Sequence, residues 1–249
     1  MGFDGIKAVI FDLDNTLIDT TGAGNKAILQ VKSLLRAKFH CPDDHINAIC
    51  EKFQEKLLTE SFRSTALNTD DARILHWDTA IREVTGDETN GPLSTECYFL
   101  WKSTRMQYFS FSDDVQNMLT ELRKSFKLLL LTNGAPQVQR EKVEICCCQT
   151  YFDAVVLAGE HTEEKPAPSI FHHCCNILGV EPQVCVMVGD SLDTDILGGL
   201  NAGLKATIWI NNSGRALTEG SPLPHYTVSS VLEVPQVLKN IKKEGICKN

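Results

Sequence analysis

Two aspartates separated by one residue, Asp12 and Asp14, follow an apolar segment near the N-terminus, within FDLDNTLIDT. Carboxylates two residues apart suit an oxygen-ligated metal site, or a nucleophile beside an acid/base group. Alternation along a strand would direct both to one side, with Leu13 opposite. Many surface loops contain such a pair by chance, so its meaning depends on the other polar residues along the chain.

Five further residues could complete a site for a phosphoryl group. Thr132 and Asn133 end the run LLLLTNG, and a hydroxyl, an amide and backbone N–H groups there can hold phosphoryl oxygens. Lys165 is the one lysine of GEHTEEKPAPS, and it would be a solvated surface residue if it stood alone. In VGDSLDTD, Asp190 is a natural oxygen ligand for Mg²⁺ and Asp195 could brace it.

Near-continuous apolar runs precede these residues and predict buried parallel strands at 7–13, 127–133, 153–159, 184–190 and 205–211. Helical patterns separate the later runs. One begins after Ser112 as N-cap, one runs from Pro168 to Gly179, and one ends at Gly203. Alternating strands and helices predict an α/β fold with a doubly wound parallel sheet. Ligands bind beyond the carboxyl ends of such strands, where the polar residues stand.

The stretch from about 21 to 110 interrupts this alternation. Its apolar residues recur at helical spacing and form no convincing strand, so they predict an inserted helical domain. We expect the α/β core to comprise residues 1–20 and 111–249 and the insertion to comprise 21–110. TGAG at 21–24 and SFS at 110–112 are the expected hinges.

Composition narrows the function. A net charge of −8 argues against a nucleic-acid partner, and an anionic substrate would need a locally positive site. No apolar run is long enough to cross a bilayer, and no secretory signal is visible. The ten cysteines contain no C-x-x-C pair, which favours reduced thiols in a cytoplasmic protein. The sequence does not fix the oligomeric state.

DLDNT, LLLTNG, Lys165 in EEKPAPSIF, and GDSLDTD resemble the four ordered motifs of the haloacid dehalogenase (HAD) superfamily. The helical insertion after the first motif resembles the type 1 cap of that superfamily, and the fold implied is a Rossmannoid core. The resemblance implies that Asp12 is a nucleophile that forms an aspartyl-phosphate. It also implies a Mg²⁺ ion held by Asp12, Asp190 and the backbone carbonyl of Asp14.

The aspartate at position 14 indicates which of the superfamily's reactions to expect. A phosphate ester leaves as a poor alkoxide, so Asp14 is expected to protonate it as a general acid and then to activate water. Lys165, Thr132 and Asn133 would neutralise the transferring phosphate. The dehalogenases need no such acid, so their activity is not expected here.

Longer stretches, including ECYFLWKSTR and PHYTVSSVLE, resemble a member whose substrate is a phosphorylated sugar acid. The same chemistry on phosphoglycolate or a sugar phosphate is the open alternative. A phospho-receiver and an inactive scaffold are the non-enzymatic ones.

Basic residues of the insertion could meet the carboxylate of a sugar acid, although each could equally lie on a solvated helix face. The candidates are Arg63, Arg73, Lys102 and Arg105. His172 and His173, within a helical pattern, are expected to pack or to face solvent rather than to bind a ligand.

Overall fold

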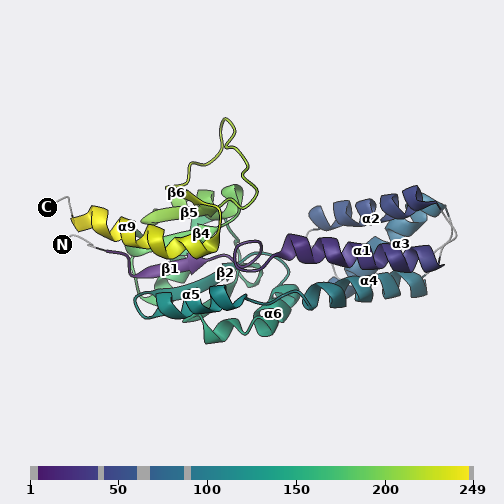
Figure 1. Cartoon of the computed structure of the whole chain (residues 1–249), viewed down its shortest axis with the longest axis horizontal. Coiled ribbons are helices and arrows are strands. Elements are labelled where there is room, and N and C mark those ends of the chain that lie inside the picture. The colour runs from purple at the N-terminus through teal and green to yellow at the C-terminus, as the bar shows by residue number, and fades with distance from the viewer. Residues whose placement is uncertain (1–4, 39–41, 61–67, 87–90, 247–249) are drawn as a thin grey trace. The chain divides into compact units, whose positions relative to one another are not determined.

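The computed structural model of the chain describes residues 5–38, 42–60, 68–86 and 91–246. It divides into two compact units (Figure 1). Met1–Ile18 and Ser110–Asn249 form what we call the core unit, and Asp19–Phe109 form the helical unit. No helix in the described ranges is long and apolar enough to cross a bilayer.

The core unit contains a six-stranded sheet in the order β3-β2-β1-β4-β5-β6, in which every neighbouring pair is parallel. The strands are β1 (Ala8–Phe11), β2 (Lys127–Thr132), β3 (Ala154–Leu157), β4 (Cys185–Gly189), β5 (Ala206–Ile210) and β6 (Tyr226–Val228). The doubly wound parallel sheet is confirmed. All five predicted strands are present, each shorter than its apolar run.

Strand β6 was not predicted. It is three residues long and pairs with β5 at the edge of the sheet, from Ile208↔Tyr226 to Ile210↔Val228. A segment this short, with only Val228 buried, lacks the periodic pattern that identifies a strand.

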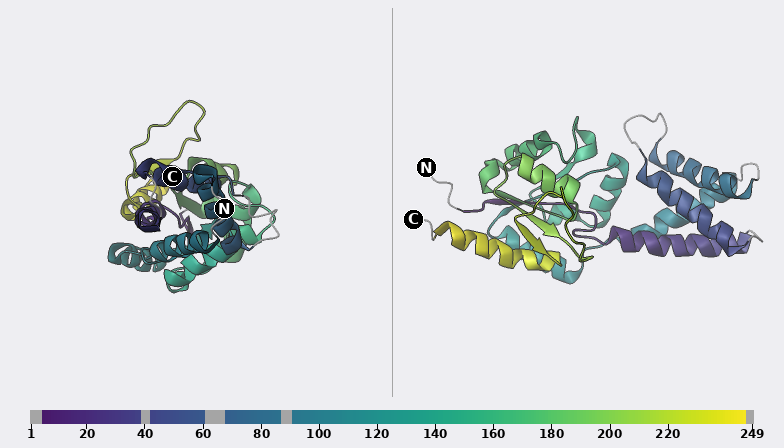
Figure 2. Two further views of the ribbon diagram at one scale, coloured as in Figure 1. Left: turned by 90° about the vertical axis from the view of Figure 1, so that its right-hand side faces the viewer. Right: turned by 90° about the horizontal axis from the view of Figure 1, so that it is seen from above.

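Helices cover both faces of the sheet (Figures 1 and 2). Ala8 and Ile10 of β1 lie in one core cluster with Phe171 and Cys174 of α7, so their neighbours Val9 and Phe11 face the opposite layer. The helices of this unit are α5 (Asp113–Arg123), α6 (Pro136–Ile145), α7 (Pro168–Leu178), α8 (Leu197–Asn201) and α9 (Val234–Ile246).

The predicted helix ends agree with the structure in two cases. The side chain of Ser112 accepts a hydrogen bond from the backbone N–H of Val115 at the start of α5. Gly179 caps α7 in the left-handed conformation. The third helical pattern begins differently, as a π-helical turn over Leu192–Ile196 that continues into α8.

The helical unit has four described helices, α1 (Thr20–Lys38), α2 (Asp43–Leu58), α3 (Thr69–Thr85) and α4 (Gly91–Met106). They bury an aromatic core in which Phe53 stacks on Trp77, with ring centroids 3.9 Å apart, and meets Trp101 edge-on. Lys26, near the start of α1, lies 3.9 Å from the ring centroid of Tyr108, which follows α4. The two ends of the unit's chain therefore lie together.

The segment 21–24, which we expected to be a hinge, lies inside the first turns of α1. The carboxylate of Asp19 accepts a hydrogen bond of 2.7 Å from the backbone N–H of Gly22, as an N-cap does. Because Asp19 caps the helix, the two glycines that follow are held in helical geometry.

Candidate active site

Three strand ends bring polar residues to one edge of the core unit's sheet. Asp12 follows β1, Thr132 is the last residue of β2, and Asp190 follows β4. The backbone N–H of Asp12 donates to the carbonyl of Val188 at 2.9 Å, so the pairing of β1 with β4 continues as far as Asp12. The carboxyl ends of the three central strands thus share one edge.

A tight loop follows Asp12. Asn15 has a φ of 57°, a left-handed conformation that Asn adopts more readily than most residues. Its backbone N–H donates to the carbonyl of Ile18 at 2.7 Å, and that of Leu17 donates to the carbonyl of Leu13 at 3.0 Å. This loop turns Asp14 away from the line of the strand while keeping it at the same edge.

Lys165 lies at the centre of the site and is almost fully buried. Its ammonium group is 2.7 Å from a carboxylate oxygen of Asp12 and 2.7 Å from one of Asp195, and it donates to the carbonyl of Leu131 at 3.0 Å. The three polar partners compensate for the loss of water around a buried charge. The lysine expected to face solvent if it stood alone is therefore a buried cation.

Asp12, Asp190 and Asp195 form an acidic cluster in which one oxygen of each lies within 4.8 Å of the others. Such an all-oxygen set fits a hard divalent cation. Asp195 is already engaged on both oxygens, by Lys165 and by the backbone N–H of Ser191 at 3.1 Å. Asp12 and Asp190 are therefore the side chains best placed to take up a metal.

The site holds more negative than positive charge. Burial raises the pKa of Asp12 to about 7 against the opposing effect of Lys165, and the carboxylates of Asp195 and Asp14 add to the rise. Burial raises the pKa of Asp190 to about 6, and Asp195 again adds to it. Burial alone would lower the pKa of Lys165, but the attraction of Asp12 and Asp195 prevails and the pKa is raised.

Asp14 is held by two residues of α6 that the sequence reasoning missed. The ammonium group of Lys142 lies 2.7 and 2.8 Å from its two carboxylate oxygens, and Nε2 of Gln139 lies 2.9 Å from Oδ2. Both side chains are buried. They are three residues apart on the helix and so share one face, and this spacing of two long polar side chains is the signal that could have revealed them.

Thr132 and Asn133 occupy the same edge but are partly engaged. The hydroxyl of Thr132 accepts from Gln139 at 2.9 Å. The side-chain amide of Asn133 donates to the carbonyl of Lys165 at 2.8 Å and accepts from its backbone N–H at 3.1 Å. In this conformation the Asn133 amide positions the backbone of Lys165.

Two predicted basic residues of the insertion line a cavity of about 390 Å³ that lies wholly within the helical unit. The guanidinium of Arg105 lies 4.3 Å from the ring centroid of Trp101. Arg73 is buried and donates twice to Glu60, at 3.2 Å each. Beside the cavity lie polar Thr20, Thr21, Asn25 and Gln54 and apolar Ile28, Leu57 and Leu58.

The other candidates lie elsewhere. Lys102 is paired with Asp70 at 3.0 Å, and Arg63 lies outside the described residues. His172 contacts the carbonyl of Ala202 at 3.1 Å, and the ring of His173 packs against that of His161. These histidine contacts agree with the packing role expected for the pair.

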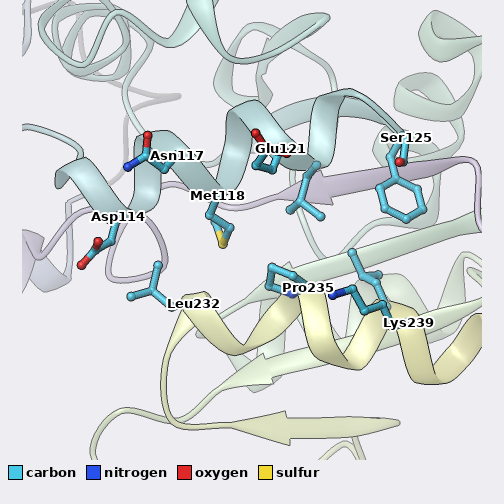
Figure 3. Close-up of a pocket in the computed structure, with 11 residues that line it drawn as sticks. Asp114, Asn117, Met118, Glu121, Ser125, Leu232, Pro235 and Lys239 are labelled. Atoms are coloured by element: carbon cyan, nitrogen blue, oxygen red, sulfur yellow. The ribbon is translucent and has the colours of Figure 1, made fainter.

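The core unit has a cavity of its own, of about 720 Å³, between α5 and α9 (Figure 3). Met118, Leu232 and Pro235 contribute to its apolar lining, and Asp114 and Lys239 stand on its rim. It contains none of the residues gathered around Lys165. This cavity is therefore separate from the cluster at the strand ends.

Comparison with known proteins identifies the group to which these features belong. The family model for haloacid dehalogenase-like hydrolases matches residues 6–203. N-acylneuraminate-9-phosphatase of Mus musculus is 58% identical over 241 residues, which cover 97% of each chain. The Homo sapiens protein of the same name is 57% identical over the same length. The resemblance to a phosphatase acting on a phosphorylated sugar acid is confirmed.

Solved structures share the fold. The HAD-hydrolase YfnB of Bacillus subtilis, in a structure bound to magnesium, is 20% identical with a TM-score of 0.69, over 94% of this chain and 99% of its own. A 2-haloacid dehalogenase of Pseudomonas syringae is 26% identical with a TM-score of 0.66, over 94% and 99%. The chain thus shares its architecture with a HAD-hydrolase and with a dehalogenase.

Proposed function

The chain belongs to the haloacid dehalogenase-like hydrolase family, and from that premise we propose that it is a Mg²⁺-dependent phosphatase that hydrolyses N-acylneuraminate 9-phosphate. The observation that carries the proposal is the burial of Lys165 between Asp12 and Asp195 at the carboxyl edge of the sheet. Such a buried cation beside a carboxylate lets an acidic protein receive an anionic phosphoryl group.

Asp12 is the proposed nucleophile. One of its oxygens attacks phosphorus as the ester oxygen departs, which leaves an aspartyl-phosphate and a free sugar acid. The Lys165 ammonium, 2.7 Å from this carboxylate, stabilises charge on the phosphoryl oxygens. Thr132 and the backbone around Asn133 serve the same purpose.

Asp14 is the proposed general acid and base. It protonates the departing sugar alkoxide and then removes a proton from the water that hydrolyses the aspartyl-phosphate. Both steps return the enzyme to its starting state, with phosphate as the second product.

The proposed metal ligands are Asp12, Asp190 and the backbone carbonyl of Asp14, with Asp195 bracing them. A bound Mg²⁺ would offset repulsion between the nucleophile and the phosphate and orient the transferring group. The all-oxygen cluster of Asp12, Asp190 and Asp195 fits that ion.

We assign selection of the sugar to the insertion, expected at residues 21–110, as a cap. Its cavity of about 390 Å³ is of the size that small ligands occupy, and Arg105, which lines it, carries a guanidinium group that can pair with a carboxylate. The guanidinium of the other lining arginine, Arg73, is already paired with Glu60. The partner is therefore a small phosphorylated sugar acid. A cytoplasmic location completes the proposal, since the described cysteines are free thiols.

The test measures phosphate release with Mg²⁺ from N-acetylneuraminate 9-phosphate beside phosphoglycolate and a panel of sugar phosphates. We expect the first substrate to give the highest kcat/KM and Asp12→Asn to abolish turnover. An equal rate on phosphoglycolate would reject the substrate but keep the phosphatase. Turnover by Asp12→Asn would reject the nucleophile, and no turnover of any substrate by folded wild type would reject the enzyme.

A further inference from the structure

Two buried polar residues of α6 contact the candidate acid/base residue. Lys142 and Gln139 are each almost fully buried. Burying an ammonium group costs free energy that only paired partners offset, so a buried lysine needs a partner of opposite charge. Lys142 contacts Asp14 on both carboxylate oxygens, at 2.7 and 2.8 Å.

Gln139 links this contact to the phosphate side of the site. Its Nε2 lies 2.9 Å from Oδ2 of Asp14 and 2.9 Å from the hydroxyl of Thr132, and it also donates to the carbonyl of Asn133. One amide group therefore contacts both Asp14 and Thr132, the last residue of β2. Lys142, three residues further along α6, contacts both oxygens of the same carboxylate.

We infer that Lys142 and Gln139 are positioning residues, which set the direction of the Asp14 carboxylate so that it reaches the leaving-group oxygen of the substrate. The inference rests on the proposed function, because it concerns the acid/base residue of that reaction. A side chain whose two oxygens are fixed by a buried cation and an amide has few rotamers, and a misplacement of about 1 Å can cost on the order of a hundredfold in rate.

The inference makes Lys142 important for proton transfer by Asp14 and not for substrate binding. Protonation of the leaving group matters when the leaving group is a sugar alkoxide. It matters little when nitrophenolate departs, since that anion is stable without a proton. The value of kcat/KM reports events up to the first irreversible step, so it isolates the attack by Asp12 from the later hydrolysis.

The experiment compares kcat/KM of the full-length, Mg²⁺-loaded wild type and Lys142→Met on N-acetylneuraminate 9-phosphate and on p-nitrophenyl phosphate. Methionine keeps the length of the side chain and removes its charge. We expect a loss of about 10- to 100-fold on the sugar ester and of less than about threefold on the nitrophenyl ester. Gln139→Leu should show the same pattern with a smaller loss.

Arg140→Met is the matched control, because Arg140 is on the same helix, is exposed and pairs with Glu160. It should match wild type on both substrates. A thermal-shift titration with Mg²⁺ shows that each variant is folded and keeps its metal site.

A double-mutant cycle gives a second readout. In an Asp14→Asn background, Lys142→Met should cost less than about twofold, because a residue that acts only through Asp14 has nothing left to position. Equal losses on the two substrates, or a full additional loss in the Asp14→Asn background, would overturn the inference and assign Lys142 a purely structural role.

Failure of the inference is distinguishable from failure of the proposed function. If wild type hydrolyses the sugar ester and Asp14→Asn impairs it, the function stands. An unchanged rate for Lys142→Met on that ester would then reject only the positioning role inferred for Lys142. If wild type hydrolyses neither ester, the proposed function itself is rejected.

Discussion

The interior of the site brings three carboxylates, Asp12, Asp190 and Asp195, around the single ammonium group of Lys165. Burial raises the pKa of Asp12 to about 7 and that of Asp190 to about 6, and the neighbouring carboxylates add to the rise although a cation is present. A divalent cation would supply the missing positive charge. Its binding must therefore compete with protons.

We accordingly predict that Mg²⁺ binds more tightly as pH rises from 5.5 to 8. At pH 5.5 Asp12 is protonated and Asp190 is partly so, whereas at pH 8 both are ionised. Binding at the lower pH must release protons. Isothermal titration in two buffers of different ionisation enthalpy measures both the affinity and the number of protons released. Equal affinity at the two pH values, with no proton release, would contradict this.

The same pKa values predict how the metal-free protein responds to pH. Asp12 and Asp190 have higher pKa values folded than unfolded, so the folded state binds more protons than the unfolded state between about pH 4 and 7. Their contribution to stability is full below about pH 4 and is lost as pH rises through 6 and 7. Urea unfolding in EDTA at pH 6 and 8 would detect the loss. Replacing both by Asn should flatten it.

At the scale of single elements, the π-helical turn after β4 packs so closely against the end of that strand that a glycine is needed there. A Cβ built on Gly189, the last residue of β4, would lie 2.2 Å from Oδ2 of Asp195. Asp195 in turn forms an ion pair with Lys165. The absence of a side chain at Gly189 is therefore a requirement of the site.

Gly189→Ala should lower the unfolding free energy by about 1–3 kcal/mol through overpacking, and it should reduce kcat as Asp195 moves. Gly24→Ala is the control, since a Cβ there meets nothing within 4 Å and the position lies within α1. That change should stabilise the protein by about 0.5–1 kcal/mol. Urea unfolding measures the unfolding free energy of both variants and of wild type. A Gly189→Ala protein as stable as wild type would refute the steric argument.

Helix α4 presents Arg105 to the cavity of the helical unit. If this guanidinium binds the carboxylate of the sugar acid, Arg105→Gln should raise KM for N-acetylneuraminate 9-phosphate about tenfold, the value of one charged hydrogen bond. The rate on p-nitrophenyl phosphate should not change. Arg36→Ala, which breaks an exposed pair with Asp43, is the control and should leave both rates unchanged. A KM within twofold of wild type for Arg105→Gln would refute the assignment.

The sequence predicted the elements with long apolar runs and missed those whose signal is short or lies in side-chain contacts. The five strands β1 to β5 were visible because each lies in a near-continuous apolar run. Strand β6, of three residues, gave no periodicity. Asp12 and Asp190 were recognisable because each follows the end of a strand, and Lys165 because it is the one lysine of the loop after β3. Lys142 and Gln139 were not, since only the packed position of α6 reveals that they meet a residue more than 120 positions earlier.

At the scale of the whole molecule, the chain forms two units with separate cores. The helical unit buries Phe53, Trp77 and Trp101 among its own helices, and at 19–109 it has the size of a small domain. The aromatic core of the helical unit is therefore built from that unit's own residues.

We predict that a fragment of residues 19–109 folds by itself. Far-ultraviolet circular dichroism should show a helical protein with a cooperative thermal transition. Fluorescence should show the blue-shifted emission of buried Trp77 and Trp101. A fragment that melts without cooperativity, or that emits like free tryptophan, would show that the core unit is needed.

The contact between Lys26 and Tyr108 has a consequence for how the chain reaches its native state. Strand β1 is synthesised first, yet its partners β2 and β4 begin at Lys127 and Cys185. Joining β1 to β2 across an unstructured segment would carry a loop-closure cost that grows with segment length. Local contacts form faster than distant ones, so the helical unit can fold before this pairing occurs. Once it has folded, its two ends are already adjacent, and β1 searches for its partner β2 across a much shorter effective loop.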